Sequence, residues 1–420
     1  MVALAHETGL NTLFFQVRPE SDALYMSSLE PWSRALTGTQ GNDPGYDPLA
    51  VLLELAHAQN IEVHAWINPY RGSASAASAT ASNHVTRTLA AHAITYNGSI
   101  VMDPSSTAVR AHVVSVIEDI VTRYDVDGIH FDDYFYPYPN MAGTPFPDQA
   151  SYDAYRMGGG TMTRGDWRRD NVNALVREVH DLLLRTKPNV RFGISPFGIY
   201  RPGMPAGIVG LDAYADIYCD AVHWMDEDWV DYVAPQLYWP TTQTPQAFEP
   251  LATWWSETAG VQEHVFAGHA AHRLGTSTAW TLGEMNAQLD IVNRLTSAPD
   301  SQMRGSLFFR YGFIEDDTLG IRRAITTRYA EPAVPPAIPR ALSAPALPLV
   351  AARSGMIEIT HPSRESVRTF GVYRASGGTF TLDQLAPAST TTLALASGTW
   401  AVSAIGIGDY ESQGVRVTVP

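Results

Sequence analysis

The sequence predicts an α/β fold: a (β/α)8 barrel of the TIM type, followed by a small β-sandwich. Residues 12–330 alternate short apolar runs with longer amphipathic stretches, which is typical of a parallel sheet covered by helices. The repeats outnumber the roughly five or six strands of a common open sheet, and no nucleotide-binding glycine loop follows the first run, so a barrel is favoured. After residue 348 the pattern changes to short alternating runs separated by Gly, Ser and Pro.

The elements expected in the barrel follow from hydrophobic periodicity. Between Pro104 and Tyr124, apolar residues recur at helical spacing and share one face, and the same spacing recurs over 166–187. The gaps between strands are mostly filled by such helical stretches. Apolar runs that we expect to be strands lie at 12–19, 61–69, 99–104, 126–134, 190–197, 231–239, 263–270 and 305–312.

The run at 99–104 is short enough to be a loop, and in that case seven strands remain and the barrel lacks its first one. Residues 1–9 resemble the last turns of a helix that stops at Gly9. A chain that opens inside a helix suggests that its start was trimmed or misassigned, so we expect the missing strand to precede Met1. No signal peptide is present in this N-terminus, which therefore says little about export.

Three segments are expected along the chain: a barrel domain at 1–330, a linker at 331–348 and a second domain at 349–420. The linker is rich in Pro and Ala, and such a segment is stiff and extended. The alternating runs of 349–420 fit a β-sandwich of the fibronectin or immunoglobulin type, although the segment is short for that class.

Composition disfavours several function classes. The net charge is −15 and the pI is near 5.2, so nucleic acid is a disfavoured partner. Cys219 is the only cysteine, which rules out an intramolecular disulfide and a cysteine-based zinc cluster. No apolar run reaches the ~18 residues of a membrane-spanning helix. The aromatic content of 10% suits sugar-stacking surfaces as well as cores.

In a barrel of this kind the active site lies at the carboxyl ends of the strands, and successive side chains alternate between the lumen and the helices. In 126–134, Ile129 and Phe131 suit the helix side, so the residues between them are expected in the lumen. The same reasoning places a polar set near the strand ends. An unpaired buried polar group costs ~1–3 kcal/mol, so this set indicates a ligand site or a connected network. Its members are Gln16, Arg18, His64, Trp66, Asn68, His130, Asp132, Tyr134, Ser195, Gln236 and Tyr238.

Asp132 and Asp133 are the candidate catalytic residues. Two adjacent carboxylates at a strand end can supply an acid or a nucleophile for glycoside hydrolysis, and the alternation favours Asp132. The alternative is that one of them caps the next segment or pairs with a loop arginine. Substrate assistance is also open: an N-acetyl carbonyl attacks, and Tyr238 and Gln236 orient the amide. Candidates for a second catalytic carboxylate are Glu20, Asp22, Asp103 and Glu315.

The candidate sugar-binding residues are polar groups that form a rim and aromatic rings that stack on pyranose faces. Structural roles are the alternatives: a satisfied core histidine for His64, and a solvated loop for Arg18 and the acidic residues after it. The candidate set is Arg18, Asp22, His64, Trp66, Asn68, Arg71, His130, Tyr134, Tyr136, Ser195, Gln236, Tyr238 and Trp239.

A metal site is the weaker alternative. His269 and His272, together with His64, His130 and Asp132, could hold a metal as in metal-dependent barrel hydrolases. Neither the HxH nor the HExxH spacing is present, so no metal and no cofactor are expected.

Several long motifs occur in order over most of 1–330: QVRPESDALYMSSLEPWSRALTGTQGNDPGYDPL (16–49), HAWINPYR (64–71), DVDGIHFDDYFYP (125–137), WRRDNVN (167–173), FGISPFGIYR (192–201) and DYVAPQLYW (231–239). With these motifs the chain resembles the bacterial glycosyl-hydrolase-like family 10, formerly a domain of unknown function. The resemblance implies a TIM-barrel glycosidase of the cell envelope, often exported or a lipoprotein. It implies a glucosaminidase-like or muramidase-like cleavage of peptidoglycan strands stripped of peptides. Members also carry a further strand before the helix that opens this chain, and some carry a trailing fibronectin-like domain.

The segment 127–134 also resembles, more distantly, the DxxDxDxE strand of chitinases. Tyr134 stands where that pattern has its acidic glutamate, so the acid role does not carry over to this position. Asp132 is left either to take the acid role or to orient an N-acetyl group.

The sequence therefore predicts a glycoside hydrolase that acts on an amino-sugar polymer, with peptidoglycan glycan strands as the expected substrate. The expected location is the cell envelope or outside the cell, which the family resemblance implies. Two alternatives stay open: a non-catalytic carbohydrate-binding barrel that has lost a catalytic residue, and a metal-dependent hydrolase or deacetylase. The expected partner is a polysaccharide, with no nucleic acid and no membrane span in this chain.

Overall fold

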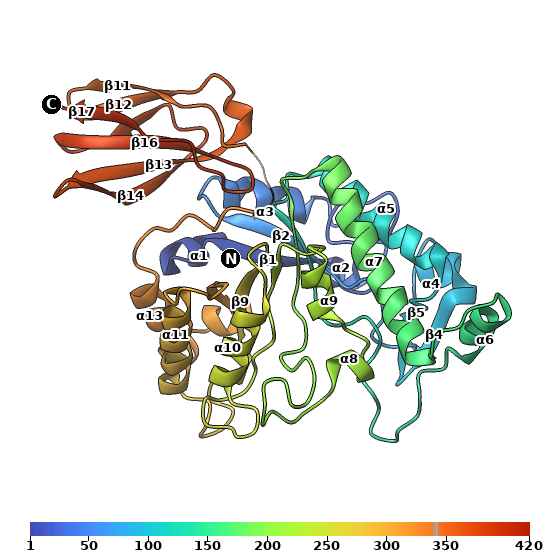
Figure 1. Ribbon diagram of the computed structural model, residues 1–420. Coiled ribbons are helices and arrows are strands. Elements are labelled where there is room, and N and C mark those ends of the chain that lie inside the picture. Colours follow the sequence, from blue (N-terminus) through green and yellow to red (C-terminus); the bar gives the residue numbers. More distant parts are fainter. Residues whose placement is uncertain (339, 341–342) are drawn as a thin grey trace. The chain divides into compact units, whose positions relative to one another are not determined.

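A computed structural model describes residues 1–338, 340 and 343–420 (Figure 1). Its main feature is a curled sheet of seven strands whose spatial order follows the chain order. The strand pairs from β2 to β10 are all parallel. The strands are β1 (Thr12–Arg18), β2 (Glu62–Ile67), β6 (Gly128–Phe131), β7 (Arg191–Ile194), β8 (Tyr232–Val233), β9 (His264–His269) and β10 (Met303–Phe308).

The first two strands of this sheet are parallel as well. The Asn11 carbonyl accepts from the Glu62 amide at one end, and the Arg18 carbonyl accepts from the Asn68 amide at the other, both at about 3 Å. The residue numbers rise together on the two strands, which is the parallel arrangement. Within the described ranges, β1 and β10 are the two edges of the sheet.

Helices lie between the strands in sequence and confirm the predicted (β/α) barrel. The longer ones are α3 (Pro48–His57), α5 (Thr107–Arg123), α7 (Arg164–Thr186), α10 (Phe248–Thr258) and α11 (Leu282–Thr296). No helix in the described part of the chain is long and apolar enough to cross a membrane. The shorter helices are α1 (Val2–Thr8), α2 (Arg34–Thr37), α4 (Val85–Thr88), α6 (Gln149–Met157), α8 (Ala213–Asp216), α9 (Ala221–Asp226), α12 (Tyr311–Glu315) and α13 (Ile321–Arg328).

The long helices begin at side chains that bind their first unpaired amides. The Ser106 hydroxyl accepts from the Val109 amide before α5, and the Thr163 hydroxyl accepts from Asp166 before α7. The apolar face predicted for α5 is buried along its whole length. Its residues are Val109, Val113, Val116, Ile117, Ile120 and Val121.

The short run at 99–104 forms a strand, but this strand lies outside the barrel sheet. β5 (Ser99–Met102) pairs antiparallel with β3 (Arg71–Ser73) and β4 (Ala93–Tyr96) in a small separate sheet. Seven of the eight predicted runs therefore supply barrel strands. The predicted helix end at Gly9 is also present: α1 stops there, and Gly9 adopts the left-handed conformation at φ 74°.

Contacts divide the chain into two compact units. One unit comprises Met1–Leu13, Leu52–Val63 and Gly320–Pro420, and the other comprises Phe14–Val51 and His64–Leu319. The domain limits predicted at residues 330 and 348 stay predictions. Part of the predicted linker, residues 339 and 341–342, lies outside the described residues.

The C-terminal part of the first unit forms the predicted β-sandwich. Two antiparallel sheets contribute buried residues to one core, among them Ile357, Phe370 and Val402. One sheet consists of β11 (Leu349–Arg353), β12 (Met356–Thr360) and β15 (Thr392–Ala394). The other consists of β14 (Thr379–Pro387), β13 (Val367–Ser376), β16 (Gly398–Gly406) and β17 (Val415–Val419).

The barrel lumen is filled by a layer of rings. The Phe14 ring lies 4.8 Å from the His64 ring and 4.7 Å from the His130 ring, measured between centroids. The Tyr232 ring stacks on His130 at 5.9 Å. Two neighbouring strands make room for these rings with glycine: a Cβ on Gly193 would lie 2.0 Å from Tyr232, and one on Gly128 would lie 2.6 Å from His64.

Replacing Gly193 with Ala is expected to lower the free energy of unfolding by about 3 kcal/mol, the upper part of the range for overpacked cores. The added methyl group would overlap the buried Tyr232 ring, which is surrounded by other rings and has little room to move. Urea unfolding followed by circular dichroism measures the change. The control is Gly312→Ala in α12, where nothing lies within 4 Å of the added Cβ. Equal unfolding midpoints for the two variants would contradict the packing of this layer.

Candidate active site

Two carboxyl groups lie at the carboxyl end of β6, the third strand of the barrel sheet. Asp132 and Asp133 directly follow β6, and both side chains are buried. In a parallel barrel this is the end at which the strands bring their loops together. The structure therefore places the predicted catalytic pair where a barrel enzyme carries its active site.

Asp132 is held by the neighbouring strand and by its own segment. The indole Nε1 of Trp66, on β2, donates to Asp132 Oδ2 at 3.3 Å. The backbone amide of Tyr134 donates to Oδ1 at 3.1 Å. Each carboxyl oxygen thus has one donor, which fixes the orientation of the group.

Asp133 has a different set of partners. The Tyr138 hydroxyl donates to Asp133 Oδ2, and the Gln236 side chain lowers the pKa of this carboxyl group. Gln236 follows β8, and its Nε2 donates to the Ser195 carbonyl at 3.1 Å, which fixes its amide. Residues from two segments beyond β6 therefore converge on Asp133.

Burial makes the carboxyl pair retain protons at unusually high pH. Burial, and after it the charge of Asp133, raises the pKa of Asp132 to about 7. Burial also raises the pKa of Asp133 above its ordinary value, while the bond from Tyr138 opposes this. Two coupled acids of this kind share their protons, so the pair holds a proton near neutral pH.

Arg71 is the cation beside this pair. Its charge lowers the pKa of both aspartates and so offsets part of the effect of burial. Its guanidinium carbon lies 4.1 Å from the centre of the Tyr134 ring. Tyr134 is 40% exposed, so this stacked pair lies where the site meets solvent.

A cluster of aromatic rings forms another wall of the site. The Tyr238 ring stacks on Phe309 with centroids 6.1 Å apart, and His272 meets both rings edge-on at 5.3 and 5.2 Å. Trp66 reaches the same Phe309 ring at 6.4 Å. Burial and the nearby carboxylates raise the pKa of the Tyr238 hydroxyl, which remains protonated. Flat apolar faces of this kind suit stacking on sugar rings.

His64 and His130 lie below this level, in the buried ring layer. Their Nδ1 atoms lie 2.8 and 2.9 Å from the Tyr232 hydroxyl oxygen. Burial, and then the neighbouring His64 ring, lowers the pKa of His130 well below its usual value, so this ring is neutral. This placement fits the alternative of satisfied core histidines, and direct sugar contact by either ring stays a prediction.

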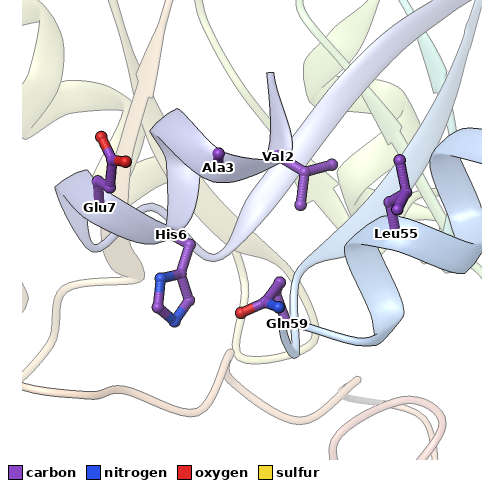
Figure 2. Close-up of a pocket in the computed structure, with 6 residues that line it drawn as sticks. All are labelled: Val2, Ala3, His6, Glu7, Leu55 and Gln59. Atoms are coloured by element: carbon purple, nitrogen blue, oxygen red, sulfur yellow. The ribbon is translucent and has the colours of Figure 1, made fainter.

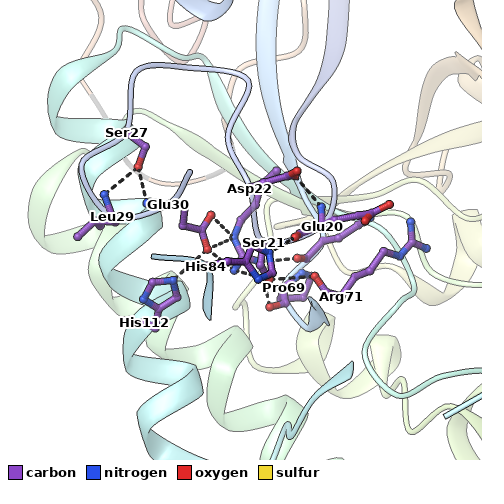
Figure 3. A network of polar contacts seen from close by, with 12 residues as sticks. Glu20, Ser21, Asp22, Ser27, Leu29, Glu30, Pro69, Arg71, His84 and His112 are labelled. Atoms are coloured by element: carbon purple, nitrogen blue, oxygen red, sulfur yellow. Dashed lines mark hydrogen bonds and ion pairs between the residues drawn. The ribbon is translucent and has the colours of Figure 1, made fainter. Parts of the chain in front are cut away.

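Asp22 lies in a polar network that includes Glu30 and Arg71 (Figure 3), and hydrogen bonds connect Arg18 and Asn68 to the same network. Arg18 is 1% exposed and pairs with Glu30. Asn68 is fully buried and donates from Nδ2 to the Pro19 carbonyl at 3.1 Å. Asp22 accepts from the Gln40 amide at 3.0 Å. The structure thus brings these predicted residues together, and it surrounds them with protein partners.

The remaining predicted contacts lie in well-packed surroundings. Tyr136 is buried against Tyr218 and Phe146, with ring centroids 5.0 and 5.5 Å away. Trp239 packs edge-on against Phe197 at 5.5 Å, and Ser195 is buried. A sugar contact for these three predicted residues stays a prediction.

Four other carboxylates were candidates for a second catalytic group, and each has a local partner. The Ser73 hydroxyl donates to Glu20, and the Ser151 hydroxyl donates to Asp103 at 2.6 Å. Tyr311 donates to Glu315 at 2.7 Å, and Asp22 binds Gln40 as described above. Asp133 is the carboxyl group that directly influences Asp132.

Several site residues were missed by the sequence reasoning. Phe14 and Tyr232 share the lumen side of their strands with predicted residues, so the same alternation would have found them. Tyr138 lies in the long connection after β6, where no periodicity exists. Phe309 directly follows β10, a strand for which no lumen side was assigned.

The described residues show no group of three or more His, Cys, Asp or Glu side chains arranged to hold a metal ion. The histidines considered for such a site have other partners. His269 bonds Gln288 and Ser306, both at 3.0 Å, and His272 Nδ1 bonds the Phe309 carbonyl at 3.1 Å.

A pocket in the other compact unit lacks the features of the carboxyl site (Figure 2). It lies between α1 and the end of α3 and is lined by Val2, Ala3, His6, Glu7, Leu55 and Gln59. Its titratable residues, His6 and Glu7, are exposed on the surface of α1. This pocket therefore offers no buried acid, in contrast to the Asp132–Asp133 pair.

The family described as "Glycosyl hydrolase-like 10" matches residues 1–281. The chain belongs to this family. It is 36% identical over 390 residues to "Glycosyl hydrolase YngK" of Bacillus subtilis (strain 168), covering 88% of this chain and 75% of that protein. It is 32% identical over 329 residues to "Glycosyl hydrolase DigH" of Escherichia coli (strain K12), covering 73% of each chain. The predicted family is thereby confirmed.

A solved structure shares the fold. The PgaB (BpsB) glycoside hydrolase domain from Bordetella bronchiseptica aligns with a TM-score of 0.50 at 10% identity, covering 77% of this chain and 92% of that one. Membership of a glycosyl hydrolase-like family supports a glycosidase, for which a carbohydrate is the substrate.

Replacing Tyr232 with Phe is expected to lower the free energy of unfolding by about 1–3 kcal/mol, because the change removes the hydrogen bonds of two buried imidazoles. Guanidinium unfolding measures the loss. Tyr70→Phe is the matched control, because the buried Tyr70 hydroxyl has no hydrogen-bond partner among the described residues. A loss as large in the control as in Tyr232→Phe would show that these bonds are not the cause.

Proposed function

We propose that this protein is a glycoside hydrolase that cleaves glycosidic bonds in an amino-sugar polymer, with peptidoglycan glycan strands as the substrate. The observation that carries the proposal is the buried Asp132–Asp133 pair, in which burial raises the pKa of Asp132 to about 7. Glycosidases need such a carboxyl group, because it must donate a proton to the leaving oxygen at neutral pH. Membership of the glycosyl hydrolase-like family supports the same reaction class.

Asp132 is the general acid of the proposed reaction. Its protonated carboxyl group donates its proton to the glycosidic oxygen as the bond from that oxygen to C1 breaks. The Trp66 and Tyr134 donors hold the two oxygens of the group in place. Proton transfer from a positioned acid contributes about 10²–10⁴-fold to such reactions.

The geometry favours substrate assistance for the second half of the reaction. The other candidate carboxylates have local partners, and Asp133 is the carboxyl group whose charge raises the pKa of Asp132. In our proposal the carbonyl oxygen of the N-acetyl group attacks C1, and Asp133 accepts a hydrogen bond from the amide N–H. Water then attacks C1, the bond from C1 to the acetyl oxygen breaks to restore the N-acetyl group, and the Asp132 carboxylate takes the proton from the water. Gln236 and Tyr238 orient the amide, as the sequence suggested.

The walls of the site support an amino-sugar polymer as the substrate. Tyr238, Phe309 and Trp66 offer ring faces for pyranoses, and Arg71 offers a positive charge at the solvent side. The resemblance of the motifs to the glycosidase family of the cell envelope supports peptidoglycan strands and an exported location. The C-terminal sandwich is proposed as a spacer or wall-binding module.

Replacing Asp132 with Asn is expected to lower kcat on peptide-free glycan strands at least ~10²-fold while the fold is retained, because the amide cannot donate the catalytic proton. Release of reducing ends measures turnover, and circular dichroism verifies the fold. Asp119→Asn serves as control, since Asp119 pairs with Arg123 on the exposed side of α5. Near-normal turnover by Asp132→Asn would overturn the assignment. Binding of the strands by the unaltered protein without any cleavage would instead favour a carbohydrate-binding barrel.

The activity is expected to fall as the pH rises through about 7. Asp132 acts in its protonated form, and its raised pKa means that the active fraction decreases by about tenfold per pH unit above this value. Arg71→Gln removes a charge that lowers this pKa, so the falling limb should move to higher pH. The profile of kcat/KM against pH measures both effects. A limb that stays in place in Arg71→Gln would argue against Asp132 as the titrating acid.

A further inference from the structure

We infer that the buried ion pair of Arg18 and Glu30 is a positioning device for Arg71, the cation of the carboxyl site. The pair holds the backbone of residues 68–71 and thereby fixes where the Arg71 side chain enters the site. This inference rests on the proposed function for its kinetic readout, and it assigns to Arg18 a positioning role in place of the sugar contact predicted from the sequence.

The ion pair is closed off from solvent. The side chains of Arg18 and Glu30 are 1% and 0% exposed. Arg18 Nε donates to both carboxyl oxygens of Glu30 at 3.0 and 2.8 Å, and Nη2 donates to Oε1 at 2.6 Å. His112 of α5 bonds the same carboxyl group at 2.9 Å (Figure 3). Burial alone raises the pKa of Glu30, but Arg18 and His112 bring it down to about 2, so the pair stays ionised.

Arg18 has no donor left for a substrate. A guanidinium group has five N–H donors. Besides Glu30, Nη1 donates to the Asn68 carbonyl at 2.6 Å and to the Pro69 carbonyl at 3.1 Å, and Nη2 donates to the Ser21 hydroxyl at 3.0 Å. These contacts account for every N–H of the group.

The same contacts fix the segment that ends at Arg71. The Ser21 hydroxyl, held by Arg18, donates to the Arg71 carbonyl at 2.9 Å. The Tyr70 carbonyl accepts from the Met102 amide of β5 at 2.8 Å. Every carbonyl from residue 68 to residue 71 is therefore bonded, three of them to Arg18 or to its partner Ser21. Figure 3 shows that the Arg71 side chain leaves this network and extends away from it.

The direction in which Arg71 leaves the network matters for the carboxyl pair. At its far end the guanidinium lies over Tyr134 and acts on both Asp132 and Asp133. A shift of the backbone at residue 71 would move this charge, and the Arg18 and Ser21 bonds supply three of the four carbonyl contacts that oppose such a shift. Displacement of a group in an active site by about 1 Å can lower the reaction rate ~10²-fold.

A buried ion pair is a weak source of net stability, because the desolvation of both charges offsets their attraction. Arg18 and Glu30 therefore need another explanation, and their geometry supplies one. A rigid planar fork that binds a carboxylate and two carbonyls fixes a backbone more firmly than a lysine can, because an ammonium group is a single point with three donors.

The test uses Arg18→Lys and Ser21→Ala in the full chain. Lysine keeps the positive charge beside Glu30 but cannot also hold both carbonyls and Ser21. Ser21→Ala removes the hydroxyl that donates to the Arg71 carbonyl and accepts from one Arg18 N–H, but it leaves the pairing of Arg18 with Glu30 and its bonds to the two carbonyls. It is the milder variant if Arg18→Lys fails to fold. Arg169→Lys is the matched control: Arg169 pairs with Asp166, and it contacts the 212–218 segment through the Tyr214 carbonyl at 3.0 Å, with no bond to 68–71.

Two readouts follow the charge at the site. One is the falling limb of kcat against pH, and the other is the infrared difference titration of the carboxyl band that Asp132→Asn lacks. The other titratable or charged groups that face the pair are Arg71 from β3, Tyr134 and Tyr138 from the segment after β6, Cys219 from the segment before α9, and Tyr238 from the segment after β8.

We expect Arg18→Lys to move both the kinetic limb and the infrared titration upward by about one pH unit, and Ser21→Ala to move them in the same direction by less. The kcat of Arg18→Lys should fall by about tenfold or more. The Arg169→Lys control should leave both titrations in place. Titrations unchanged in folded Arg18→Lys and Ser21→Ala would overturn the inference. If the unaltered protein cleaves no glycan, the proposed function fails, but the infrared titration still decides the positioning role.

Discussion

The rest of the site depends on two hydrogen bonds in the barrel lumen, which join the Tyr232 hydroxyl to the imidazoles of His64 and His130. A hydroxyl has one proton, so it donates to one Nδ1 atom and accepts from the other, and this ties β2, β6 and β8 together at one level. His130 and Asp132 lie two residues apart, and residues at this spacing face the same side of a sheet. The position of the ring layer along the barrel axis thus determines the position of the carboxyl pair, which follows it on the same segment.

The ring layer also contributes to the burial of the carboxyl pair. Phe14 packs edge-on against His130, Tyr232 stacks on His130, and the Trp66 indole bonds Asp132. Removing water from a carboxylate favours its neutral form, which is the form a general acid needs. The same packing that stabilises the barrel therefore produces the chemistry at its end, and the glycines at 128 and 193 are the positions that allow it.

The sequence predicted the barrel well, because periodicity reports which face of a strand or helix is buried. The buried stripe of α5 and the lumen positions of His64, His130 and Asp132 all followed from alternation. It could not predict the partners of Arg18, because Glu30 lies in an irregular segment whose path depends on tertiary packing. Tyr138 was missed for the same reason, since its hydroxyl reaches Asp133 from a long connection that has no repeat.

The strands and the segments after them have different effects on the pKa of Asp132. The strands place the carboxyl pair and bury it, and burial is the largest of the effects that raise the pKa of Asp132. The bond from the Tyr134 amide and the charge of Arg71 oppose this effect, and at the resulting pKa of about 7 the group can donate a proton and regain it during one turnover. A small change at residue 71 is therefore enough to retune the acid without altering the barrel. For that reason the buried pair that holds 68–71 matters more for the reaction than for the fold.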